Sequence, residues 1–166
     1  MPGMLLSPRA AGVGLALAAA LALAVAHGSE FWAGLVPCAL CLVERWPYRI
    51  AIALGLAAAL LPPPFARVAL ALLGLTLLTA IAAAAVHAGV EAGWWPSPLP
   101  QCAAPAFSGG TIAERLARMP ERPSKPCDEP TYLIPFLPVS MAAMNLIFAC
   151  VLTAVAARAA LRKPLS

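Results

Sequence analysis

The sequence predicts an all-α membrane protein: a four-transmembrane-helix bundle with two outward loops and a short amphipathic helix in the second loop. Of the 166 residues, 62% are hydrophobic and only 11% are charged, which is too apolar for a soluble domain of this size. Four stretches approach the roughly 20 apolar residues that cross a bilayer. Alanine and leucine dominate all four, and no long alternating pattern suggests a barrel.

These apolar stretches divide the chain, a single membrane domain, into spans and loops. The predicted parts are a span at about 10–26, an outer loop at 27–41, a span at 42–61, a cytoplasmic turn at 62–65, a span at 66–87, an outer loop at 88–133, a span at 136–157 and a tail at 158–166. The first stretch ends in "AVA" at Ala26 like a cleavable signal peptide. We expect it to be kept as a helix, because its apolar run is long enough.

The second span needs residues that are not apolar. Only Ile50–Leu61 lie between Arg49 and the prolines of the turn, and such a helix would be about 18 Å long against a core of ~30 Å. The helix must therefore begin before Arg49, which brings Glu44 and Arg45 into the outer headgroup layer. Pro47 lacks an N–H, so the helix is expected to kink or restart there.

The third and fourth spans follow from the turn and the last apolar run. Consecutive prolines end the second helix, so the second and third spans form an antiparallel hairpin. In the fourth span, Asn145 is a polar residue among apolar ones. We expect it to hydrogen-bond a neighbouring helix, with a cofactor contact as the alternative.

The second outer loop is rich in proline and contains one helical signal, "TIAERLARM". Thr111 and Glu114 fit a capping box, and Ile112, Leu116 and Met119 then share a face. We predict a short amphipathic helix on the outer membrane surface, with a solvated turn of helix as the alternative.

Charge predicts the orientation. The N-terminus, the cytoplasmic turn with Arg67 and the C-terminal tail carry basic residues and no acid, while the acids lie toward the other side. By the positive-inside rule both termini are cytoplasmic and both loops face outward.

The five cysteines carry the strongest functional signal. Cys38 and Cys41 form a C-x-x-C in the first outer segment, and Cys102 and Cys127 lie in the second. Outside the cytoplasm such thiols meet oxidising conditions and pair. A second C-x-x-C or well-spaced histidines would favour zinc, and the chain has neither, so we expect redox chemistry and no metal. Cys150, in the fourth span, is expected to be a small buried residue without a role.

Arg45 strengthens the redox interpretation of the first pair. In a helix, Cys41 and Arg45 are four residues apart and share a face. The guanidinium would lower the thiol pKa from ~8.5 towards 7 and hold a thiolate at the membrane surface. The alternative, a lipid anchor, is the one that we favour for Arg49.

The second pair, Cys102 and Cys127, would close a loop of about 25 residues, worth about 3.5 kcal/mol in the chain-entropy model. A structural staple is one interpretation. The mobility expected of a proline-rich loop favours a disulfide that another protein can reach.

The chain resembles the DsbB (disulfide bond formation protein B) family over nearly its whole length. The resemblance rests on the four spans, the two cysteine pairs, "PCALCLVERW" at the start of the second helix, "WPSP" before Cys102 and "CDE" at Cys127. It implies a multi-pass, monomeric thiol:quinone oxidoreductase of the bacterial inner membrane, with its redox loops in the periplasm. Such an enzyme re-oxidises a thioredoxin-fold, DsbA-like partner and passes the electrons to ubiquinone or menaquinone; nucleic acid is not expected as a partner.

The resemblance also implies roles for single residues. Cys41 would be the thiol beside the quinone, Arg45 its polar partner and Cys38 the thiol that communicates with the second loop. A histidine near the end of the third helix accompanies the quinone, and His87 is the only candidate. An interfacial histidine without a catalytic role is the alternative.

Three rival classes are kept. A vitamin K epoxide reductase-like enzyme would carry its active pair near a late helix, whereas here the pair opens the second. A metal-binding membrane subunit would need ligands from a flexible loop. A disulfide-stapled structural subunit would keep all four outer cysteines oxidised, and no quinone would copurify with it.

Overall fold

A computed structural model describes residues 7–102, 111–117, 125–134 and 136–161 of the chain. The elements in order are α1 (Pro8–Phe31), α2 (Ala39–Leu60), α3 (Pro63–Glu91), the 3-10 helix η1 (Pro100–Cys102), α4 (Ile112–Ala117) and α5 (Met141–Leu161). Within these ranges the structure has no strand, only an isolated bridge between the backbones of Cys38 and Lys125.

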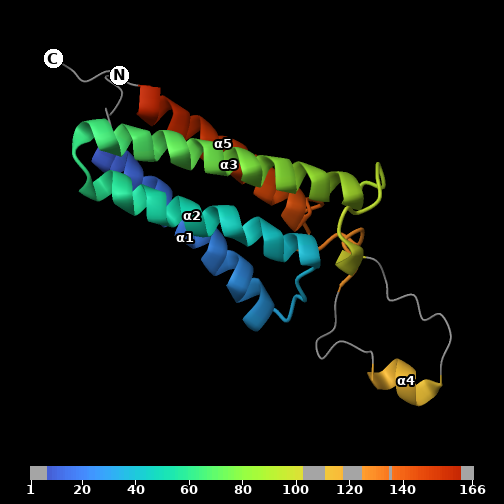
Figure 1. Ribbon diagram of the computed structural model, residues 1–166. Coiled ribbons are helices and arrows are strands. Elements are labelled where there is room, and N and C mark those ends of the chain that lie inside the picture. Colours follow the sequence, from blue (N-terminus) through green and yellow to red (C-terminus); the bar gives the residue numbers. More distant parts are fainter. Residues whose placement is uncertain (1–6, 103–110, 118–124, 135, 162–166) are drawn as a thin grey trace.

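The four long helices lie side by side as an up-and-down bundle (Figure 1). The beginning of α1, the turn between α2 and α3 and the end of α5 lie at one end, and the connections that contain the cysteine pairs lie at the other (Figure 1). Helix α4 stands away from the bundle beyond that second end. This arrangement agrees with the predicted antiparallel hairpin of the second and third helices.

Three helices, α1, α3 and α5, are long and apolar enough to cross a membrane among the parts of the chain described. Together with the all-helical fold they confirm a helical membrane protein. Helix α2 has 22 residues, begins before Arg49 as expected and continues through Pro47 without a restart. Because Glu44, Arg45 and Arg49 interrupt its apolar sequence, its role as a fourth span stays a prediction.

Small residues bring α1 and α2 together. A Cβ atom added to Gly12 would lie 2.6 Å from the carbonyl oxygen of Gly55, so both positions need glycine for the two backbones to approach. The centre of the bundle is filled by leucines of α3, with Leu70, Leu73 and Leu77 fully buried. Many other leucines and valines of the long helices are exposed, as expected for side chains that face lipid.

Helix α4 begins with the predicted capping box. The backbone N–H of Thr111 donates to Glu114 Oε2 at 2.9 Å, and the N–H of Glu114 donates to Thr111 Oγ1 at 3.4 Å. Ile112 and Leu116 are exposed, while Met119 lies outside the described residues. Contact of this helix with the membrane surface stays a prediction.

Candidate functional site

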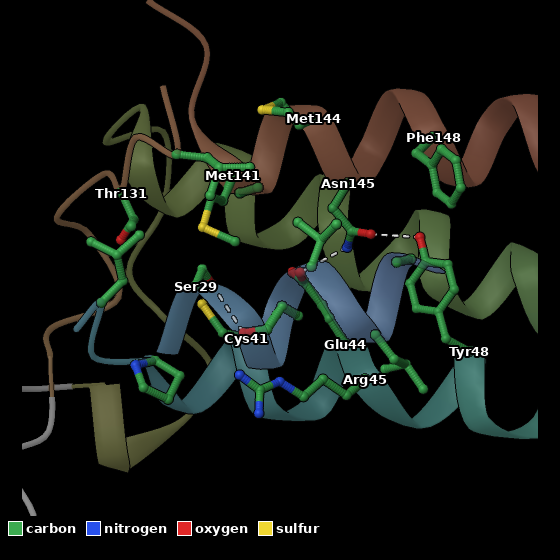
Figure 2. A pocket seen from close by; sticks show the side chains of 18 of the residues that line it. Ser29, Cys41, Glu44, Arg45, Tyr48, Thr131, Met141, Met144, Asn145 and Phe148 are labelled. Carbon is green, nitrogen blue, oxygen red and sulfur yellow. Dashed lines mark hydrogen bonds between the residues drawn. The ribbon is translucent and has the colours of Figure 1, made fainter. Parts of the chain in front are cut away.

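A cavity of about 320 Å³ opens between α1, α2 and α5 near the end of the bundle that holds the cysteines. Most of its lining is apolar, including Leu21, Met141 and Phe148. Figure 2 shows the polar side chains that interrupt this lining, from Cys41 near the outer connections to Tyr48 deeper along α2. A mostly apolar pocket with a few convergent polar groups is typical of a small-molecule site.

The C-x-x-C pair occupies the N-terminus of α2. Cys38 is the N-cap residue, and its Sγ accepts a hydrogen bond from the backbone N–H of Cys41 at 3.2 Å. The two Sγ atoms are 2.8 Å apart. Cys38 is buried, whereas Cys41 lines the cavity. The hydrogen bond from the Cys41 thiol lowers the pKa of Cys38 below its usual range, and the backbone N–H of Cys41 acts in the same direction. The same hydrogen bond to Cys38, together with burial, raises the pKa of Cys41, which corrects the expectation that Arg45 holds Cys41 as a thiolate.

Removal of that donor should raise the pKa of Cys38. In a Cys150→Ala background with the Cys102–Cys127 disulfide intact, we expect Cys38 to titrate at higher pH in Cys41→Ala than in Cys41→Ser, because the serine hydroxyl can still donate. Thiolate absorbance followed against pH measures the difference. Identical titrations in the two variants would contradict a Cys38 thiolate stabilised by residue 41.

A chain of buried polar groups connects the pair to the cavity. His87 of α3 places Nε2 3.5 Å from Cys38 Sγ and Nδ1 2.9 Å from Glu44 Oε1. The other oxygen of Glu44 accepts from Asn145 Nδ2 at 2.8 Å, and Asn145 Oδ1 in turn accepts from the Tyr48 hydroxyl (Figure 2). The expected interhelical hydrogen bond of Asn145 is therefore present, and His87 lies beside the thiols.

Arg45 has a different neighbour from the one that its sequence position suggested. Its Nη1 lies 3.0 Å from Glu30 Oε2 of α1, in an ion pair. Arg45 is 8% exposed and lines the same cavity as Cys41, and its Nε finds no hydrogen-bond partner among the described residues. The Arg45 side chain therefore places a buried positive charge beside the cavity. Arg45 is thus a buried residue and not a surface anchor.

The second cysteine pair packs directly against the first. Cys102 and Cys127 form a disulfide, and both belong to one buried cluster with Cys38. The backbone bridge between Cys38 and Lys125 holds the returning loop in place. Cys102 and Cys127 are 5% and 1% exposed, which corrects the expectation of an accessible disulfide. The proline-rich composition of the loop could not show that its cysteines dock onto the start of α2.

The structure also corrects the surroundings of Cys150. Its side chain is exposed on α5 rather than buried, and it does not line the cavity. An apolar run is expected both for a helix face buried in the bundle and for one that faces lipid, so the sequence around Cys150 could not distinguish the two.

Two site residues, Glu44 and Glu30, were missed as functional candidates. Glu44 was assigned to the headgroup layer, yet it is 7% exposed and is the centre of the polar network. A usable signal was present: Cys41, Glu44, Arg45 and Tyr48 follow helical spacing along one side of α2. Glu30 lies beyond residue 26, where the first span is predicted to end, so the sequence predicts that it lies in the outer loop.

A comparison with protein families adds one finding. The family model described as "Disulfide bond formation protein DsbB" matches residues 8–159. That range contains all five cysteines, Arg45 and His87. No match was found among curated proteins or among solved structures.

Proposed function

Since the chain belongs to the DsbB family, a family of membrane oxidoreductases of disulfide-bond formation, we propose that it is a quinone-dependent thiol oxidase. It re-oxidises a thioredoxin-fold, DsbA-like partner in the periplasm and passes the electrons to membrane quinone. We further propose that it lies in the bacterial inner membrane with both termini in the cytoplasm, as the distribution of basic residues indicates.

One observation carries this proposal. The Cys102–Cys127 disulfide and Cys38 share a buried cluster, while Cys41, in contact with Cys38, lines the cavity. This arrangement supports a path in which the outer disulfide accepts electrons from the partner and the C-x-x-C pair delivers them to the cavity. Each transfer between two cysteine pairs is a thiolate attacking a disulfide, which requires contact between the groups.

The cavity fits a quinone ring. It is largely apolar and of suitable size for a small planar headgroup, and Arg45 places a positive charge beside it that favours a carbonyl oxygen. Cys41, Arg45 and Tyr48 would hold the ring, and a bound quinone would supply an acceptor for two electrons and two protons.

Side chains of the protein can accept the protons that the two thiols release. Closing the Cys38–Cys41 disulfide removes two electrons and two protons from the two thiols. His87 Nε2 is within reach of Cys38 Sγ and can accept a proton, while the carboxylate of Glu44 on Nδ1 fixes the ring and stabilises its charged form. Asn145 holds Glu44 from the opposite side.

Quinone reduction by the purified protein tests the proposal. With a reduced thioredoxin-fold partner and a soluble quinone analogue, we expect the quinone absorbance to fall at a rate that requires all four outer cysteines. A structural or metal-binding subunit would leave the quinone oxidised. Reduction that persists in Cys41→Ser would exclude the proposed route.

Cys150→Ala is the matched control, and it is expected to be silent. The residue is exposed on α5 and lies outside the cavity, so its loss changes neither thiol chemistry nor packing in the core. Partner oxidation should match that of the wild type at equal protein concentration. A loss of oxidation at normal expression would give Cys150 a role that the structure does not.

A further inference from the structure

The reactive pair and His87 also form a constellation of metal ligands. The Sγ atoms of Cys38 and Cys41 and a ring nitrogen of His87 all lie within 4.8 Å of one another. Cys38 and His87 are each 3% exposed, and Cys41 is partly buried. Their spacing along the chain does not indicate a shared metal site, because His87 is 46 residues beyond Cys41 and lies on another helix.

The orientation of His87 favours a metal on one particular atom. Glu44 Oε1 lies 2.9 Å from Nδ1 and fixes the tautomer that carries the proton there. The lone pair of Nε2 then faces the sulfurs, with Cys38 Sγ at 3.5 Å. A carboxylate behind a ligating histidine is the usual second layer of a zinc site, and Glu44 is itself held by Asn145.

The ligand types select a thiophilic cation. Two thiolates and one imidazole suit Zn²⁺ in tetrahedral geometry, with a fourth position for water or an oxygen ligand. Glu91 Oε1 lies 3.9 Å from His87 Nε2, outside the group formed by the two sulfurs and the ring nitrogen. Zinc–sulfur bonds of about 2.3 Å require the two sulfurs to separate by about 1 Å from their present contact. Rotation of Cys41 into the adjoining cavity allows this separation.

We propose that the reduced protein binds one Zn²⁺ through Cys38, Cys41 and His87, and that bound zinc withholds the pair from oxidation. Binding converts two thiols into two thiolates and releases two protons, with no change of oxidation state. The oxidised pair has no thiolates to offer, so zinc and disulfide formation exclude each other. The binding stands on this geometry alone, whereas the inhibition rests on the proposed function.

Zinc binding is measured on the purified full-length protein, with neither quinone nor partner present. We use a Cys150→Ala background, a phosphine reductant and competition against a chromophoric chelator. We expect one zinc per chain in the reduced protein and none in the oxidised protein. His87→Asn and Cys41→Ser should weaken binding at least about 100-fold, and Glu44→Gln about 10–100-fold. His27→Asn, a distant histidine, should have no effect.

X-ray absorption of zinc in the wild-type reduced protein gives an answer that does not depend on variant folding. Two sulfurs and one imidazole nitrogen are expected. Four sulfurs would mean that Cys102 and Cys127 also bind and would overturn the proposed ligand set, as would zinc without sulfur ligands. Because the binding assay contains no quinone, a protein that fails to reduce quinone can still bind zinc, and the two proposals fail separately.

Discussion

Cys127→Ser is expected to accumulate a covalent adduct with a thioredoxin-fold partner, and Cys102→Ser is expected to accumulate none. The order of exchange behind this prediction is that the partner's thiolate attacks Cys102 and forms a mixed disulfide. In the wild type with its C-x-x-C pair oxidised, the released Cys127 then attacks Cys38 of the Cys38–Cys41 disulfide, its neighbour in the buried cluster, and displaces Cys41 as the thiolate that reduces the quinone. A serine at position 127 cannot attack a disulfide, so the mixed disulfide between the partner and Cys102 cannot pass its electrons to Cys38.

In Cys127→Ser, Cys102 is a free thiol, so the adduct forms by its attack on the oxidised partner. Non-reducing gels after mixing with that partner should show an adduct band for Cys127→Ser and none for Cys102→Ser, whose remaining loop thiol, Cys127, is only 1% exposed, with Cys150→Ser as the control for an unrelated thiol. An adduct of equal intensity without Cys102, or one that maps to Cys38, would contradict the order. Because Cys102 is 5% exposed, we expect the partner to displace the loop from the start of α2 before the thiols react.

Arg45→Ala is expected to weaken quinone binding about 10–100-fold, which corresponds to the roughly 1.5–3 kcal/mol of a hydrogen bond to a charged group. The variant loses the unpartnered Nε donor and the positive charge beside the cavity. Stability should fall less, because Glu30 keeps a partly exposed carboxylate that water can solvate. Quinone titrations and thermal unfolding of the same preparations measure the two effects.

Glu30→Gln tests separately the two contributions of Arg45: its positive charge and its placement by the ion pair with Glu30. This variant removes the ion pair but keeps the guanidinium, so quinone affinity should change much less than in Arg45→Ala. Arg45→Lys keeps the charge and lacks the planar set of donors, so it should fall between the two. If Arg45→Ala kept the quinone affinity and turnover of the wild type, Arg45 would have no role in quinone binding.

Composition and proline placement were sufficient to predict the helical class and the hairpin of α2 and α3. Helix ends were harder to predict, because polar residues can extend a helix beyond its apolar run. In α1, the side chains of His27 and Ser29 form hydrogen bonds with the carbonyl oxygens of Leu23 and Ala26, respectively, and the helix continues to Phe31. In α5, Ser140 Oγ accepts a hydrogen bond from the N–H of Ala143 and caps the helix. The helix therefore begins at Met141, after the boundary that the sequence predicted.

Local spacing identified the thiols and Arg45, but it could not supply their partners. The contact between His87 and Glu44 joins residues 43 positions apart, and that between Asn145 and Glu44 joins residues 101 apart. Such contacts depend on how α2, α3 and α5 are rotated about their axes, which a hydrophobic pattern leaves open. For the same reason helical spacing could place Arg45 beside Cys41, with which it lines the cavity, but could not predict its ion pair with Glu30 of α1.

An anaerobic electron balance is the most direct test of the central claim, that thiol electrons leave through the C-x-x-C pair to a quinone. The purified protein is mixed with excess reduced thioredoxin-fold partner and a limiting amount of quinone, and partner disulfide and quinol are quantified in the same samples. Over many turnovers the proposal predicts one partner disulfide for each quinol, whereas Cys41→Ser forms no quinol and at most the one partner disulfide per protein that its Cys102–Cys127 disulfide supplies. Many turnovers of partner disulfide without quinol, or equal amounts of both products in Cys41→Ser, would contradict it.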